Sequence, residues 1–211
     1  PLYTQAYFVY DSKKSCGLTQ SHLRFAKEPI RSPYLVSTAD FVACHNPSYV
    51  TKYDLLKHLK KGGIFLLNCQ WSAEELDANL PDAMKKAIGE KQVQFYIINA
   101  VDIAKDLGLG GRTNTILQAA FFKLVNLIPV DDAVGYMKDA IKKTYGKKGE
   151  KIVQMNCAAV DKGIENLVKV DVPAGWAGIA PKAAAKKDVP EFIENIVNVM
   201  NSQEGDSSPV S

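Results

Sequence analysis

The sequence has few cysteines and histidines, and their scarcity excludes several kinds of site. Its 211 residues include four cysteines and three histidines. Cys44 and Cys69 lie in apolar runs, where a reduced core thiol is the expected state. No C-x-x-C pair and no H-E-x-x-H motif occurs. We therefore expect no disulfide, and no metal site or iron–sulfur cluster held by this chain alone.

A strong net charge and a long apolar run are also missing. Lys and Arg number 26 against 23 Asp and Glu, and the net charge of +3 is well below that of a dedicated nucleic-acid binder. No run approaches the ~20 apolar residues that a membrane helix needs, and the first ten residues lack the zones of a signal peptide. We expect a cytoplasmic protein with no nucleic-acid and no membrane partner.

Recognisable catalytic motifs are missing as well. The sequence contains no G-x-S-x-G. The acidic pairs Glu74-Glu75 and Asp131-Asp132 stand at expected helix starts, where the helix dipole favours carboxylates. We therefore assign no catalytic residue to this chain.

What is present is an alternation of strand and helix patterns. Apolar spacing predicts a helix over residues 48–60 that stops at Lys-Lys-Gly-Gly, and Ser72 with Glu75 forms a capping box for another helix. Further strands are predicted at 3–10, 21–26, 34–37, 41–45, 64–69 and 93–98, and helices follow almost throughout from residue 99. The fold class is α/β: three layers, α/β/α, around a largely parallel or mixed sheet, Rossmann-like in outline.

The pattern changes after residue 172. We expect residues 1–172 to form the α/β domain. Residues 173–211 are rich in Pro, Ala, Gly and Lys at first, which predicts a linker laid over the surface. A short amphipathic helix at 191–200 and a polar tail follow it.

Three segments have the composition of phosphate-binding loops. They are D-S-K-K-S-C-G at 11–17, G-L-G-G-R-T-N at 108–114, and Y-G-K-K-G-E-K at 145–151, followed by Asn156 among apolar residues. Lysines, glycines and a helix start can all meet an anion. The alternatives are a hairpin turn, a helix–helix connector capped by Asn114, and a solvated loop. The second segment departs from G-x-G-x-x-G and follows a helix, so it is a poor Rossmann fingerprint.

Longer motifs resemble one family. They are AYFVYDSKKSCGLTQSHLRF, ADFVACHNPSYVTKYDLL, GIFLLNCQWSAEEL, FYIINAVDIAKDLGLGGRTNTILQAAFFKL and YGKKGEKIVQMNCAAVDKGI. Together they are similar to the third, coenzyme A-interacting domain of pyruvate:ferredoxin (flavodoxin) oxidoreductases. The resemblance runs essentially end to end.

The resemblance implies an activity for a larger parent enzyme. This is the oxidative decarboxylation of pyruvate with coenzyme A to acetyl-CoA and CO2, with ferredoxin or flavodoxin as electron acceptor. The family uses thiamine diphosphate, Mg and [4Fe-4S] clusters, all outside this domain, and its members are expected to be homodimers. The domain's own part is to bind and position coenzyme A.

Residue by residue, the resemblance implies that Lys13, Asn114 and Asn156 contact coenzyme A. Lys14 and Arg112 are added because of their charge and their proximity in sequence. Cys16 stands where the family usually has a second glycine.

A glycine-rich segment of the family's coenzyme A site is expected upstream of Pro1. The resemblance therefore implies a fragment with an incomplete site and no turnover of its own. Two other readings stay open: a free-standing nucleotide- or phosphate-binding module, and a purely structural domain.

Overall fold

The computed structural model describes residues 2–10, 18–180, 189–201 and 205, and its internal contacts divide the chain into two units, residues 1–39 and 40–211. The first unit is built on a hairpin of β1 (Tyr3–Val9) and β2 (Gln20–Ala26). The strands are antiparallel, with Tyr3 opposite Ala26 and Val9 opposite Gln20. The hairpin confirms the predicted strands at 3–10 and 21–26.

The segment after β2 is held by side chains rather than by a strand ladder. Arg24 stacks on the Tyr34 ring at 3.3 Å from its centroid, and the Val36 N–H donates to His22 Nδ1 over 3.1 Å. The strand predicted at 34–37 is wrong for this reason: the backbone donor of Val36 has a side-chain acceptor and not a neighbouring strand.

The second unit contains a four-stranded sheet in the order β3-β4-β5-β6. Its strands are β3 (Ala39–Cys44), β4 (Leu59–Asn68), β5 (Gln94–Ile98) and β6 (Val168–Lys169). β4 and β5 are parallel, with Ile64 opposite Gln94 and Asn68 opposite Ile98, whereas β6 runs antiparallel to β5. The mixed sheet agrees with the predicted fold class.

Contacts between β3 and β4 show that these two strands also run in the same direction. At the start of both strands, Lys60 Nζ lies 2.6 Å from the Asp40 carboxylate. At their far ends, Asn68 Nδ2 donates to the His45 carbonyl over 3.0 Å. The side chain of Asn68 also accepts from the Ala100 N–H, so one buried amide ties three neighbouring segments together at the carboxyl edge of the sheet.

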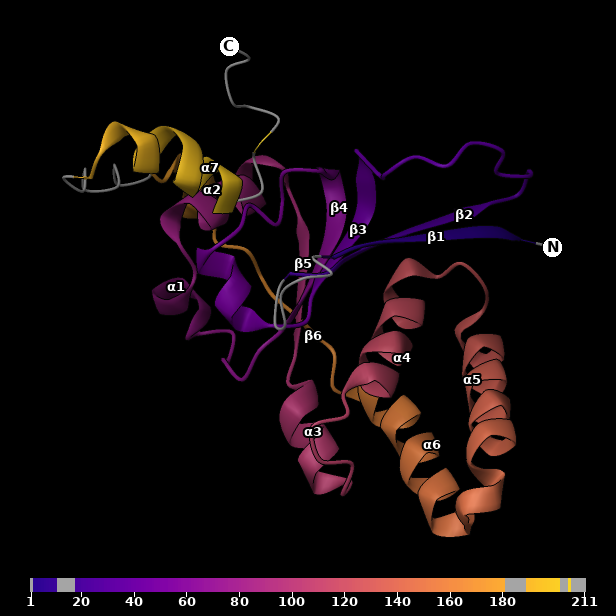
Figure 1. Cartoon of the computed structure of the whole chain (residues 1–211). Helices are drawn as coiled ribbons and strands as arrows, with labels where there is room; N and C mark the ends of the chain where they lie inside the picture. The colour runs from indigo at the N-terminus through magenta and orange to yellow at the C-terminus, as the bar shows by residue number, and fades with distance from the viewer. Residues whose placement is uncertain (1, 11–17, 181–188, 202–204, 206–211) are drawn as a thin grey trace. The chain divides into compact units, whose positions relative to one another are not determined.

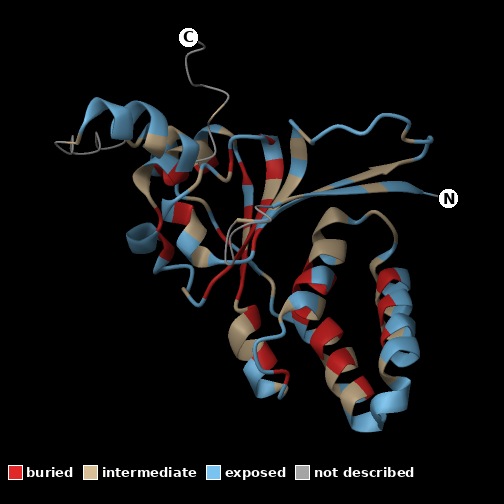
Figure 2. Ribbon diagram, viewed as in Figure 1, coloured by how far each residue is buried: buried red, intermediate tan, exposed pale blue. Residues whose placement is uncertain are grey.

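Alternate residues of the central strands fill two separate cores. Phe65 of β4 and Phe95 of β5 are fully buried on one face, with their rings stacked 5.4 Å apart. Leu66 and Ile98 belong to the core on the other face. This alternation places one helical layer on each side of the sheet, as Figures 1 and 2 show.

The helices divide between these two faces. The first face is covered by η1 (Pro47–Thr51), α1 (Leu76–Asn79), α2 (Asp82–Glu90) and η3 (Ala174–Gly178). The second is covered by α3 (Ala100–Asp106), α4 (Asn114–Val125) and α6 (Glu150–Glu165). α5 (Val130–Tyr145) and the short η2 (Gly146–Lys148) complete this side, and α5 packs on α4 and α6 in a third cluster.

The helix predicted over residues 48–60 is wrong. Its first part is the 3-10 helix η1, and Lys60 to Gly63 belong to β4 rather than to a helix end. Between these two elements the carbonyls of Leu56, Lys57 and Leu59 accept from the Lys91 ammonium. The Leu59 N–H also donates to the Leu56 carbonyl, so the chain makes a tight turn before β4.

Part of the predicted surface linker belongs instead to the hydrophobic core. Trp176 is only 4% exposed, and its Nε1 donates to Asp77 Oδ1 over 2.9 Å. Asp77 also lies 3.5 Å from the ammonium of Lys85, which is itself buried. A Cβ added at Gly89 would overlap the Ala177 backbone, so α2 and η3 are in close contact. The domain boundary at residue 172 stays a prediction, but the linker interpretation is wrong at Trp176.

The amphipathic helix predicted at 191–200 is present. A π-helical stretch, η4 (Ile193–Val197), is followed by α7 (Asn198–Asn201). Among the residues that the structure describes, no helix is long and apolar enough to cross a membrane.

Truncation of the buried indole tests the anchoring of the segment after β6. Trp176→Ala should lower the free energy of unfolding by about 3 to 5 kcal/mol, the usual cost of removing a buried aromatic side chain. Chemical denaturation followed by circular dichroism measures this value. Phe192→Ala, at a side chain that is 66% exposed, is the control and should stay within about 0.5 kcal/mol of the parent. An equally small loss for Trp176→Ala would contradict the assignment.

Candidate functional site

The G-L-G-G segment begins as a helix terminator. Gly108 has a φ of +71° and follows the last turn of α3. Its N–H donates to the Lys105 carbonyl over 2.9 Å, and the Leu109 N–H donates to the Ala104 carbonyl over 2.8 Å. These two bonds are a Schellman motif, and Leu109 is buried as that motif requires. The first glycine of the segment therefore has a structural role.

The second half of the G-L-G-G-R-T-N segment has free space around it. Gly110 has a φ of +63°, and a Cβ added at Gly110 or Gly111 would have nothing within 4 Å. Arg112 folds back on this loop, with its Nε donating to the Leu109 carbonyl over 3.0 Å, while the residue stays exposed. The loop thus offers backbone and a guanidinium to solvent just before α4. Because α3 rather than a strand precedes it, the loop is a helix–helix connector and not a Rossmann fingerprint.

Asn114 is the first residue of α4, and it is exposed. The expected capping role is wrong, because Thr113 occupies the cap position and its side chain makes no capping hydrogen bond. The first bond within the helix runs from the Leu117 N–H to the Thr113 carbonyl. The N–H groups of Asn114, Thr115 and Ile116 precede it, so they point out of the helix start, where an anion is favoured.

Asn156 lies on the buried side of α6. It is 6% exposed, and its Nδ2 donates to the Ile152 carbonyl one turn earlier over 2.8 Å. This hydrogen bond fixes the orientation of the amide. The neighbouring Met155 approaches the connector, since a Cβ on Gly108 would lie 3.2 Å from Met155 Cε. The second and third candidate segments, 48 residues apart between Gly108 and Asn156 in the sequence, therefore meet in the fold.

The crossing of α4 and α6 fixes how far apart these groups are. A Cβ on Gly163 would overlap the carbonyl oxygen of Ile116, so the two helices touch backbone to backbone at this point. Asn114 is two residues before the crossing on α4, and Asn156 is seven residues before it on α6. At 1.5 Å per residue, Asn156 lies about 10 Å from the crossing along α6. An extended ligand is needed to touch both asparagines.

The lysine-rich segment leads into α6 at the same end of that helix. η2 carries Lys147 and Lys148, both exposed, and the Lys148 ammonium lies 5.4 Å from the Tyr145 ring centroid. Gly149, with a φ of +103°, occupies the cap position of α6. The structure therefore brings positive charge close to the start of the helix that carries Asn156.

The remaining predicted residues are not placed. Lys13 and Lys14 lie in residues 11–17, outside the described part of the chain. Of the residues predicted to bind a ligand, the structure brings Arg112, Asn114 and Asn156 into one region of the helical layer formed by α3, α4 and α6. The contribution of the two lysines stays a prediction.

The thiols of Cys44 and Cys69 lack the lowered pKa of an activated nucleophile. Burial raises the pKa of Cys44 to about 11, and it also raises the pKa of Cys69. A raised pKa disfavours the reactive thiolate at neutral pH. Within the described residues, no group of three or more His, Cys, Asp or Glu side chains converges as a metal site would require.

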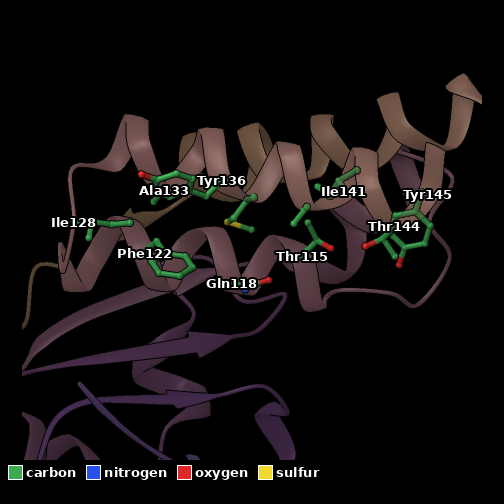
Figure 3. Close-up of a pocket in the computed structure, with 11 residues that line it drawn as sticks. Thr115, Gln118, Phe122, Ile128, Ala133, Tyr136, Ile141, Thr144 and Tyr145 are labelled. Carbon is green, nitrogen blue, oxygen red and sulfur yellow. The ribbon is translucent and has the colours of Figure 1, made fainter. Parts of the chain in front are cut away.

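A groove between α4 and α5 escaped the sequence analysis. It has a volume of about 340 Å³, and its lining combines apolar side chains with the hydroxyl groups of Thr115, Tyr136, Thr144 and Tyr145 and the amide of Gln118 (Figure 3). The apolar spacing of Val134, Met137 and Ile141 on α5 predicts a buried face. That spacing could not show that α5 stands far enough from α4 to leave a groove.

Two solved structures share the fold of this chain. The solved structure of pyruvate oxidoreductase subunit PORC from Thermotoga maritima matches with a TM-score of 0.61 at 17% identity, over 81% of this chain and 83% of that one. A structure of 2-oxoglutarate:ferredoxin oxidoreductase from Magnetococcus marinus, with 2-oxoglutarate, coenzyme A and succinyl-CoA bound, matches with a TM-score of 0.50 at 20% identity, over 86% of this chain and 26% of that one. The fold of this chain is therefore similar to that of both structures.

Sequence comparison gives the family. A family model described as pyruvate ferredoxin/flavodoxin oxidoreductase matches residues 1–166. The pyruvate:ferredoxin oxidoreductase of Moorella thermoacetica is 56% identical and the pyruvate-flavodoxin oxidoreductase of Enterobacter agglomerans is 58% identical, each over 100% of this chain. The chain belongs to the pyruvate ferredoxin/flavodoxin oxidoreductase family. It spans about 18% of the length of these relatives.

The contact between α4 and α6 can be tested with a pair of glycine variants. Gly163→Ala should destabilise the chain by about 1 to 3 kcal/mol, because its methyl group would force the two helices apart. Gly135→Ala, on the open side of α5, has nothing within 4 Å of the added Cβ and should stabilise the chain by about 0.5 to 1 kcal/mol through helix propensity. Thermal and chemical unfolding measure both values. Equal effects of the two substitutions would contradict the close crossing.

Proposed function

We propose that this chain is the coenzyme A-binding domain of a pyruvate:ferredoxin or pyruvate:flavodoxin oxidoreductase. The observation that carries the proposal is the meeting of the G-L-G-G-R-T-N connector and the M-N segment of α6 in a chain of this family. The relatives' names give pyruvate as substrate and ferredoxin or flavodoxin as electron carrier. The related 2-oxoglutarate enzyme was solved with coenzyme A bound.

The arrangement suits a phosphorylated, extended molecule. In the proposed complex, the start of α4 and the exposed Arg112 meet phosphate groups, because both offer N–H donors and positive charge. Asn156, about 10 Å along α6, presents a fixed amide to a more distant part of the ligand. A carrier held at both points has a defined direction, which is what delivery of its thiol to an acyl group requires.

The rest of the reaction is assigned to other parts of the enzyme. The parent enzyme would convert pyruvate and coenzyme A to acetyl-CoA and CO2 and pass two electrons to its carrier protein. Thiamine diphosphate, Mg2+ and [4Fe-4S] clusters would be held by other parts of the parent enzyme. The other domains of the parent, and a second copy in a homodimer, are its proposed partners.

Two asparagine variants test the site in the full-length oxidoreductase. Asn114→Ala and Asn156→Ala should each raise the KM for coenzyme A about tenfold, the scale of one lost hydrogen bond to a charged or buried group. Release of CO2 from pyruvate without coenzyme A should be unchanged, because that step uses none of these residues. Steady-state kinetics with coenzyme A as varied substrate and a CO2-exchange assay measure the two quantities.

Asn166→Ala is the matched control for Asn156→Ala. Asn166 follows α6 and its Nδ2 donates to the Lys162 carbonyl, the same bond to the preceding turn that Asn156 makes. Loss of the Asn166 side chain should leave the KM for coenzyme A unchanged. If all three variants act alike, the asparagines have structural roles only. If ATP competes with coenzyme A as strongly as dephospho-coenzyme A does, the domain is better described as a general nucleotide-binding module.

A further inference from the structure

The C-terminal helix formed by η4 and α7 presents an apolar stripe to solvent. Phe192, Ile196 and Met200 recur at every fourth residue, so they lie along one side of the helix, with Ile193 beside them. Phe192 is 66% exposed and Met200 is 60% exposed, and each of the two isoleucines is 37% exposed. Figure 2 shows this helix largely in the colour of exposed residues. An apolar stripe of this kind normally faces a core, so its exposure calls for a partner.

The apolar stripe does not belong to the core of its own unit. Within the described chain, none of the three hydrophobic clusters includes a residue of 189–201. At 3.6 residues per turn, Asn198 lies roughly 160° around the helix from Ile196. A pocket between this helix and the end of η1 is lined by Lys52, Tyr53, Asn198 and Asn201. The helix thus turns its polar side to its own unit and its apolar stripe away from it.

The charge of the helix narrows the choice of partner. Residues 189–201 include Glu191 and Glu194 and contain no Lys or Arg. Helices that bind a lipid surface are rich in Lys and Arg on their polar face, so an anionic membrane is a poor partner for this helix. A protein surface that has an apolar hollow with basic residues at its rim would complement both the stripe and the two carboxylates.

The small size of the stripe favours a partner in the same polypeptide. From Phe192 to Met200 it is about 12 Å long, and a helix with its side chains is about 10 Å wide. Two separate chains that met through this stripe alone would bury far less than the roughly 1,000 Å² of a specific interface. A domain of the same polypeptide loses less freedom on docking, so a small contact is sufficient. The relatives contain such domains, because this chain spans about 18% of their length.

We propose that the helix of residues 191–201 docks onto another domain of the parent oxidoreductase, with Phe192, Ile196 and Met200 buried in an apolar hollow of that domain. The inference rests on one part of the proposed function, namely that this chain is one domain of a larger enzyme. It does not depend on where coenzyme A binds, because the helix contains none of the residues assigned to the coenzyme A site.

Hydrogen–deuterium exchange under anaerobic conditions, read by mass spectrometry, tests the docking. The full-length oxidoreductase is compared with the 211-residue chain. Backbone amides of residues 191–201 should exchange at least tenfold more slowly in the full-length enzyme, because a docked helix opens less often. The amides of β5, an inner strand of the sheet, should exchange equally slowly in both proteins and are the internal reference.

Two variants of the full-length enzyme assign the protection to the stripe. Phe192→Ala should remove most of the protection of residues 191–201. Asn195→Ala is the matched control: Asn195 lies on the polar side of the same helix, where its Nδ2 donates to Glu191 Oε1 one turn earlier, and its loss should leave the protection intact. Both changes raise helix propensity, so a loss at Phe192 cannot come from a weaker helix. Full protection in Phe192→Ala would contradict the proposal.

Three further results would overturn it. Equal exchange of residues 191–201 in the two proteins would show that no domain covers the helix. Protection in the 211-residue chain that disappears on dilution would assign the stripe to a second copy. Protection in that chain that disappears on removal of residues 202–211 would assign it to the chain's own tail, where a Cβ added at Gly205 would lie 3.0 Å from Met200 Sδ.

The same exchange measurement separates this proposal from the coenzyme A site. Asn114→Ala and Asn156→Ala should leave the exchange of residues 191–201 unchanged, because neither asparagine belongs to the helix. A failure of the coenzyme A assignment would appear as an unchanged KM for coenzyme A in these two variants, with the protection of the helix still present.

Discussion

The close crossing of α4 and α6 is the constraint on which the candidate site depends. Gly163 has no side chain, and this lets the carbonyl of Ile116 approach its backbone. The start of α4 is thereby held at a set distance from Asn156, and Met155 is pressed against the Gly108 connector. Any side chain at Gly163 would move the two halves of the site relative to one another. Gly163 thus controls the geometry of the candidate site, although it is not itself a candidate contact.

The opposite face of the sheet has a different kind of restraint. There, the exposed carboxylate of Asp77 pairs with the buried Lys85 ammonium and accepts from the Trp176 indole, so it joins the segment after β6 to α1 and α2. The first side of the sheet thus combines a hydrophobic core with these polar contacts, whereas the second side has the close packing of small residues between α4 and α6. The candidate coenzyme A site lies on the second side.

The two halves of the predicted site differ in how well the sequence could describe them. Helix spacing and glycines located the connector before α4, and a buried asparagine among apolar residues drew attention to Asn156. The sequence could not distinguish the roles of the glycines: Gly108 ends a helix, whereas Gly110 and Gly111 are open. It also left a capping role open for Asn114 as the alternative to a ligand contact, whereas Thr113 stands at the cap position. Such roles depend on φ angles and on neighbours that are distant in the sequence.

The sequence by itself determined the class of fold, the order of most strands and helices, and the family, because periodic apolar residues and long motifs are local properties. Tertiary structure alone decided three other features. The expected helix over residues 48–60 is a 3-10 helix, a turn that binds the Lys91 ammonium, and the start of a strand. Trp176, in an expected linker, belongs to the hydrophobic core. The spacing of α4 and α5 left a groove that no pattern indicates. The partners of Lys91 and Trp176 lie far along the chain, and all three features exist only once the helices and sheet have packed together.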